Sequence, residues 1–269
     1  MTTDQQNHLN NQEMTLTAHL EELRRRLIVC AVAVGLSFCV TYYFSKELFR
    51  LLMAPLLAVM PPEQGLIFTG LPEAFFTYLK VALVAAIFAS SPVILYEIWR
   101  FIAPGLFSRE KKYIFPFVFL STIFFVGGAL FGYYVVFPFG FSFFVGFATD
   151  FIRPMPSVKE YFSFATRMLF AFGVVFELPV FTMFLSRIGL VNHKMLSRQR
   201  KHAFLAVFMV SAVLTPPDIM SQLMMSGPLL ILYEISIIIA RIFGKKQIDE
   251  KPENESSDQD DDDDKEKTR

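Results

Sequence analysis

Three observations in the sequence predict an all-α protein that crosses a membrane several times. Apolar residues make up 54% of the 269 residues, and Phe alone occurs 32 times. The mean hydropathy is +0.44, and a soluble domain is usually less apolar and less aromatic. The apolar residues are gathered into runs as long as membrane helices require, and Lys and Arg are concentrated in alternate loops.

The charged residues divide the chain into a basic body and an acidic tail. Residues 1–248 carry a net charge of +7, and residues 249–269 carry −7. We expect the tail, residues 245–269, to be solvated and disordered because charge dominates its composition. Its run DDDDK at 261–265 fits a protease-tag sequence or a native acidic tail. The polar residues 1–14 are also expected to be disordered.

Six segments are predicted to be membrane helices, the first of them 18 residues and therefore about 27 Å long. The last two are weaker, because one has 12 residues before Pro216–Pro217 and the other is interrupted by Gly227–Pro228. The six segments are, approximately, 27–44, 75–99, 115–137, 161–188, 203–214 and 220–243.

The loop charges predict the orientation of these helices. Loops on the side of the N-terminus carry 15 Lys and Arg residues, and the opposite loops carry four. The positive-inside rule then places both termini in the cytoplasm, which an even number of helices allows. The long outer loops, 45–74 and 138–160, contain Pro and apolar residues, so we expect a packed outer cap.

The N-terminal junction HLEELRRRL, residues 19–27, admits two interpretations. In the first, Thr17 caps an amphipathic helix, and Glu21 and Glu22 pair with Arg25 and Arg26 four residues later. In the second, Glu22 faces another carboxylate at the cytoplasmic surface.

That second carboxylate is Glu110, the one acid in a basic loop, residues 100–114. Glu110 could simply relieve repulsion among its neighbours. Together with Glu22, it would instead form a site for a pair of guanidinium groups, because Arg prefers carboxylate partners.

Glu177 lies inside an otherwise apolar span, two residues before Pro179. An ionised carboxylate at this depth is costly, so Glu177 is predicted to be functional, or else protonated and bonded to a neighbouring helix. Glu234 is a similar but weaker candidate, and Glu97 is interpreted as an interfacial anchor. The chain contains no P-loop, GxGxxG or HExxH motif, and its four His are scattered, so we expect no enzyme, cofactor or metal site.

Four motifs together resemble the TatC family, the multi-spanning receptor component of the twin-arginine translocase. They are HLEELRRRL (19–27), SSPVILYEIWRFIAPGL (90–106) followed by SREKK (108–112), FGVVFELPV (172–180) and LTPPDIMSQ (214–222). The resemblance runs from about residue 15 to residue 244. It implies a glove-shaped bundle of six helices in a bacterial cytoplasmic membrane.

The resemblance also implies a role for particular residues. Glu22, Arg24, Phe101 and Glu110 would bind the signal peptide. Glu177 would contact a partner helix inside the membrane. The remaining candidates lie in outer loops, where Pro55 and Asp218 would influence assembly.

The implied activity is export of folded proteins that carry twin-arginine signal peptides, driven by the proton-motive force. The implied partners are these peptides, single-span proteins of the TatA and TatB type, further copies of the chain and membrane lipids; no nucleic acid is expected. A proton-coupled transporter would require an internal repeat, which the sequence lacks. A structural scaffold would tolerate Gln at positions 110 and 177.

Overall fold

The computed structural model describes residues 3–61, 65–68, 70–102, 114–149, 154–215 and 219–244. Within these ranges, the regular structure is helical, apart from isolated bridges such as the parallel one between Ile67 and Ser157. In chain order the helices are α1 (Thr3–Tyr43), α2 (Ser45–Leu57), α3 (Glu73–Ile102), α4 (Ile114–Phe131), the π-helix η3 (Gly132–Val136), α5 (Phe137–Val145), α6 (Val158–Phe176), α7 (Leu178–Arg187), α8 (His193–Arg198), α9 (Arg200–Leu214) and α10 (Ile219–Phe243).

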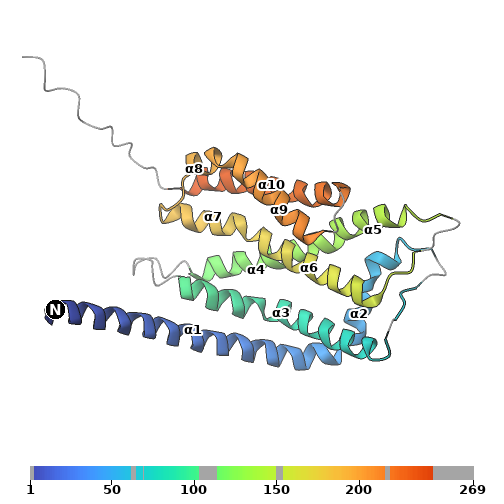
Figure 1. Ribbon diagram of the computed structural model, residues 1–269, viewed down its shortest axis with the longest axis horizontal. Helices are drawn as coiled ribbons and strands as arrows, with labels where there is room; N and C mark the ends of the chain where they lie inside the picture. Colours follow the sequence, from blue (N-terminus) through green and yellow to red (C-terminus); the bar gives the residue numbers. More distant parts are fainter. Residues whose placement is uncertain are drawn as a thin grey trace, which may run out of the picture.

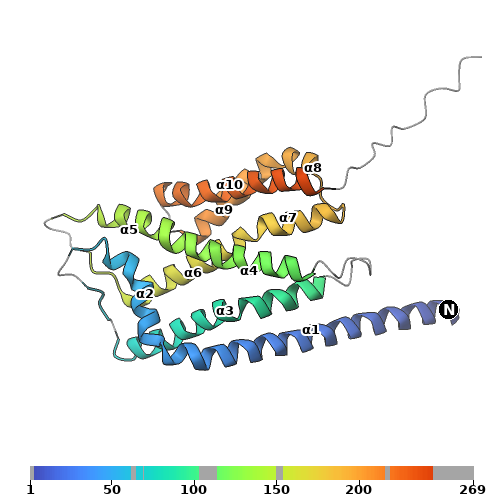
Figure 2. The same ribbon diagram turned by 180° about the vertical axis from the view of Figure 1, so that it is seen from behind.

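The long helices run side by side along the longest axis of the molecule (Figure 1). Helix α1 packs mainly along α3, α4 packs against α6, and α7 packs against α10. Helices α2 and α5 lie at one end of the bundle, and the end of α3, the start of α4 and helix α8 lie at the other (Figure 2). We call the second of these the α8 end.

Five helical stretches among the described residues are long and apolar enough to cross a membrane. This finding confirms the prediction of an all-α polytopic membrane protein. The predicted segment that is not among these five is the fifth, 203–214, which corresponds to α9, a helix of only 15 residues. The five stretches are His19–Tyr43, Glu73–Ile102, Phe115–Val145, Val158–Arg187 and Gln222–Phe243.

The N-terminal helix differs from the prediction. Helix α1 begins at Thr3, so Thr17 lies inside the helix and the prediction that it caps the helix was wrong. Residues 3–14, expected to be a disordered tail, are helical as well. The physical reason is the absence of helix breakers, because no Gly or Pro occurs between Thr3 and Val34.

Residues 45–60, the start of the first long loop of the prediction, are packed against the bundle as expected. The sequence did not predict that this segment contains a helix, α2, which buries Leu52, Met53 and Leu56 in the main core. The third span is also longer than expected, because α4 continues through η3 into α5 as far as Val145. Pro138 lies two residues after the π-helix η3, and such an irregularity within a continuous helix commonly accompanies a proline.

Two prolines inside helices leave backbone carbonyls whose hydrogen bonds come from hydroxyl groups instead. Pro55 has no N–H for the carbonyl of Leu51, and the hydroxyl of Tyr133 donates to that oxygen. Pro92 leaves the carbonyl of Phe88, which accepts the hydroxyl of Ser91 at 2.7 Å. The bond from Ser91 lies within a candidate span, where water is absent. The bond from Tyr133 is made to α2, which lies outside the candidate spans.

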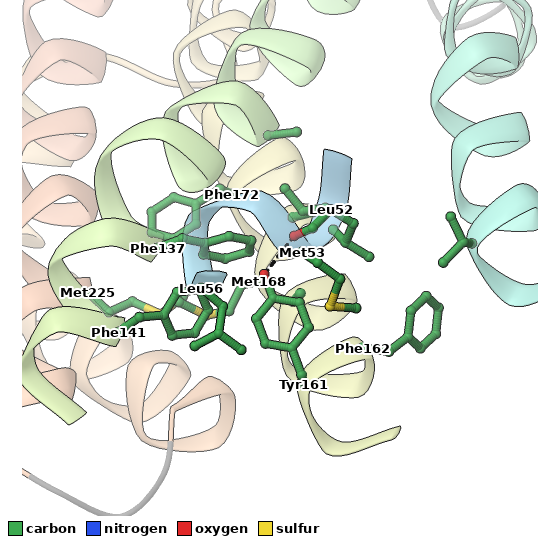
Figure 3. Packing of buried hydrophobic residues seen from close by; sticks show 14 of the residues in the cluster. Leu52, Met53, Leu56, Phe137, Phe141, Tyr161, Phe162, Met168, Phe172 and Met225 are labelled. Atoms are coloured by element: carbon green, nitrogen blue, oxygen red, sulfur yellow. Dashed lines mark hydrogen bonds between the residues drawn. The ribbon is translucent and has the colours of Figure 1, made fainter. Parts of the chain in front are cut away.

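The main core joins α2 to the middle of the bundle (Figure 3). The buried Tyr161 of α6 donates its hydroxyl to the carbonyl of Leu52 at 2.6 Å. Phe137 and Phe172 are almost completely buried beside it, and Met225 reaches the same core from α10. The core therefore contains residues from both halves of the chain.

A carboxylate fixes the connections at the α2 and α5 end of the bundle. Glu73, at the start of α3, accepts the backbone N–H of Gly70 at 3.1 Å and that of Lys159 at 2.9 Å. Lys159 lies in the first turn of α6, where N–H groups have no partner within the helix and a negative charge is favourable. Glu73 thereby ties α6 to the turn before α3.

Replacing Tyr133 by Phe tests the bond to α2. We expect Tyr133→Phe to lower the free energy of unfolding by about 1 kcal/mol, because the Leu51 carbonyl loses its donor. Thermal unfolding in detergent measures this loss. Tyr134→Phe is the matched control, since Tyr134 is 65% exposed; equal melting temperatures for both variants would contradict the assignment.

Candidate functional site

A cluster of three charged side chains joins α1 to α3 near the α8 end. Arg26 of α1 forms an ion pair with Glu22 one turn earlier, and its second terminal nitrogen lies 3.1 Å from the carboxylate of Glu97 in α3. The same nitrogen also lies 3.4 Å from the backbone carbonyl oxygen of Glu97. The predicted pairing of Glu22 with Arg26 is confirmed.

The three members of the cluster differ in their access to solvent. The side chains of Arg26 and Glu97 are 12% and 11% exposed, whereas that of Glu22 is 38% exposed. Glu22 is therefore the carboxylate that a group from outside the bundle can reach. The interpretation of Glu97 as an interfacial anchor was wrong, because its carboxylate is buried and paired with Arg26.

Arg24 does not join this cluster. Two helical residues turn the direction of the side chain by about 200°, so Arg24 points away from Glu22, and it is exposed. Sequence reasoning selected Arg24 and did not recognise the longer-range pairing of Arg26. The signal that could have indicated this pair is Glu97, an acid near the end of the second apolar segment, 75–99. The predicted topology places that end on the same side of the membrane as the three arginines, residues 24–26.

An aromatic pair lies beside the cluster. The ring of Phe101 in α3 stacks on His19 of α1, with centroids 4.5 Å apart and ring planes 20° apart. The structure thus brings Phe101 and Glu22 to the same pair of helices. Glu110 lies outside the described residues, although the helices that flank its loop end at Ile102 and begin at Ile114, both at the α8 end.

Glu177 occupies a break within a candidate span. It ends α6 and precedes α7, and one of its carboxyl oxygens is buried without a hydrogen-bond partner. Ser121 of α4 lies beside the carboxyl group and accepts the indole N–H of Trp99 at 2.7 Å. A buried carboxyl oxygen without a partner is costly in an apolar region, so Glu177 is a candidate for a functional role.

Glu234, the other intramembrane candidate, has a partner within the chain. Its carboxylate lies 2.9 Å from Arg200, at the start of α9, and both side chains are about half exposed. The positive charge of Arg200 offsets that of Glu234. Glu177 is thus distinguished from Glu234 by its lack of a cationic partner among the described residues.

The two outer-loop candidates are placed differently. Pro55 lies within α2 and is buried against the main core, where it leaves the Leu51 carbonyl for Tyr133. Asp218 lies outside the described residues. Among the residues that the structure covers, no three His, Cys, Asp or Glu side chains are grouped as metal ligands.

These features define a class of protein, a multi-span helical membrane protein with one accessible carboxylate at an end of the bundle and another inside an apolar span. A family model described as "Sec-independent protein translocase protein (TatC)" matches residues 18–228. The chain belongs to the TatC family, a component of the machinery for Sec-independent protein transport.

Relatives and solved structures agree with this assignment. The chain is 53% identical over 243 residues to a Sec-independent protein translocase protein TatC from Desulforapulum autotrophicum, with 90% of each chain covered. It is 40% identical to the protein of that name from Haemophilus influenzae, covering 88% of this chain and 92% of the relative. A crystal structure titled as the twin arginine translocase receptor TatC is 38% identical, with a TM-score of 0.74 and coverage of 82% of this chain and 97% of that one.

The environment of Glu177 predicts that a neutral side chain will be tolerated there. We expect Glu177→Gln to keep or raise the melting temperature in detergent, because the amide removes the cost of a charge at a buried, unpaired oxygen. Glu97→Gln is the comparison and should lower the melting temperature, because it weakens the pairing of a buried Arg26. A drop for Glu177→Gln as large as that for Glu97→Gln would show that Glu177 has a structural role.

Proposed function

We propose that this chain is a receptor that binds twin-arginine signal peptides of folded proteins and, with single-span partners of the TatA and TatB type, starts their export. The observation that carries the proposal is the accessible carboxylate of Glu22, held at the α8 end beside the His19–Phe101 stack. The two crystal structures that resemble the chain are titled as twin arginine translocase receptors.

In the proposed site, Glu22 and Glu110 each bind one guanidinium group of the signal peptide. Carboxylates recognise Arg by paired, charge-assisted hydrogen bonds, which Lys cannot reproduce with the same geometry. Phe101 offers an aromatic face to the apolar part of the peptide or to a guanidinium. Arg24, exposed on the other side of α1, is proposed to belong to the same signal-peptide site.

The proposed setting is the bacterial cytoplasmic membrane, with the α8 end and both termini in the cytoplasm. The loop charges support this orientation through the positive-inside rule. We propose that α9 is the fifth and shortest of six spans in a glove-shaped membrane domain covering residues 15–244, and that local thinning of the bilayer accommodates its length. Residues 245–269 form an acidic cytoplasmic tail.

Glu177 is proposed as the contact for a partner helix within the membrane. Its buried, unpartnered oxygen can accept a hydrogen bond from a polar side chain of a TatA- or TatB-type span. Pro55, which lies in α2 at the opposite end from the peptide site, and Asp218, which lies outside the described residues, are proposed to act in assembly of the receptor with further copies of itself. Membrane lipids cover the remaining apolar surface.

No catalytic step is proposed for this chain. Transport in this account takes its energy from the proton-motive force, and the chain contributes recognition and assembly. The described residues present carboxylates, aromatic rings and apolar helix faces, which suit binding of peptides and helices.

Binding of a fluorescent twin-arginine peptide to the purified protein tests the receptor site. Glu22→Gln should weaken binding by about tenfold or more, since an ion pair at a partly desolvated site is lost. Glu21→Gln, one residue away and exposed, is the matched control and should bind like the wild type. Glu110→Gln should resemble Glu22→Gln while still inserting into the membrane. Equal affinities for all four proteins would rule out the carboxylate site.

Co-purification tests the partner contact separately. Glu177→Ala should bind the signal peptide with unchanged affinity and recover markedly less TatA- or TatB-type protein, because the partner loses its acceptor. Glu234→Ala is the control, since that carboxylate has Arg200 as its partner. Normal recovery of the partners with Glu177→Ala would refute this contact.

A further inference from the structure

The ion pairs of Arg26 show that one guanidinium already occupies the accessible carboxylate. Arg26 reaches Glu22 with one terminal nitrogen and Glu97 with the other. Its Nε is buried and has no hydrogen-bond partner. Arg26 therefore makes a single hydrogen bond to each carboxylate and a bidentate pair with neither.

The two carboxylates are unequal partners for Arg26. Glu97 is buried and offers Arg26 both its carboxylate and its backbone carbonyl, whereas Glu22 is more than a third exposed. Leaving a buried charge without a partner is strongly unfavourable. Arg26 can therefore release Glu22 while it keeps Glu97, but it cannot release Glu97 at comparable cost.

Solvent access decides where a second guanidinium can enter. Two of the three paired side chains are negative and one is positive, and the charge of Arg100 also acts on Glu22, so an incoming guanidinium gains its place by displacing Arg26 from the exposed carboxylate. Arg26 and the arginine of a signal peptide have the same chemistry. They compete for the oxygens of Glu22, which lie at the edge that solvent reaches.

We propose that Arg26 is an internal guanidinium that occupies Glu22 in the free protein and yields it to a signal-peptide arginine, and that Glu97 is the positioning residue that retains Arg26 during this exchange. The inference rests on the proposed receptor function and adds to it a built-in competitor. Glu97 acts through Arg26 and does not touch the peptide. The competitor lowers the affinity for any peptide whose cation cannot displace a guanidinium.

Three variants of the full chain test the exchange by titration with the fluorescent twin-arginine peptide. Glu97→Gln should weaken binding of the peptide by about fivefold or more. In that variant Glu22 is the remaining carboxylate partner of Arg26, so Arg26 cannot release it to the peptide. The double variant Arg26→Gln/Glu97→Gln removes both the internal guanidinium and the carboxylate that retains it. The two glutamines that replace them are uncharged, so no buried charge is left without a partner. The double variant should bind the peptide more tightly than the wild type by a similar factor. Adding Glu22→Gln to the double variant should abolish the gain.

The double variant distinguishes exchange from a purely structural ion pair. If the ion pairs of Arg26 serve only to stabilise the fold, the affinity of each variant for the peptide should fall or rise with its melting temperature. The double variant should then bind the peptide no more tightly than the wild type does. A folded double variant that binds no tighter than the wild type would overturn the inference while leaving the receptor function intact. Absence of peptide binding by the wild type itself would overturn the proposed function, and the exchange with it.

Discussion

The structure depends on one constraint, that polar groups buried in the protein or in a membrane must find partners inside the protein. Hydrogen bonds within the helices satisfy most backbone N–H and C=O groups. At two prolines, side-chain hydroxyls supply hydrogen bonds to carbonyls that lack a backbone donor. Pro55 and Pro92 each remove a donor from a helix, and the hydroxyls of Tyr133 and Ser91 supply hydrogen bonds to the carbonyls concerned. Helix α2 is thereby held to the core from two sides, by Tyr133 and by Tyr161. The same constraint explains why Arg200 accompanies Glu234 on the neighbouring helix.

Against this background, the two proposed binding groups are the places where the constraint is only partly met. Glu22 is satisfied by Arg26 yet remains open to solvent on one side. Glu177 has a buried oxygen for which the described residues provide no hydrogen bond. One group lies at an end of the bundle and the other at a break between α6 and α7, so a soluble peptide and a membrane helix can engage them separately. In the proposed function, recognition of cargo and recruitment of partners would use different surfaces of one molecule.

Much of this was predictable from sequence, because apolar length and loop charge are properties of local segments. Five candidate spans, the pairing of Glu22 with Arg26 and the exceptional position of Glu177 follow from such patterns. The helix α2 was missed because Pro55 and the neighbouring prolines indicate a loop, and the contacts that stabilise it, burial in the main core and hydrogen bonds from two tyrosines, come from distant helices. The Arg26–Glu97 pair was missed because it joins residues 71 positions apart, and no local pattern specifies which arginine of three turns toward α3.

The central claim is that carboxylates at the α8 end recognise a pair of arginines, and photo-crosslinking in membrane vesicles tests it most directly. A precursor with a photoreactive group beside its twin arginines would be compared with the same precursor carrying two lysines, on wild-type protein and on the variant Glu22→Ala/Glu110→Ala. The account predicts strong crosslinks only for the arginine precursor on the wild type. Equal crosslinking in all four combinations would mean that these acids serve membrane topology alone, and would contradict the account.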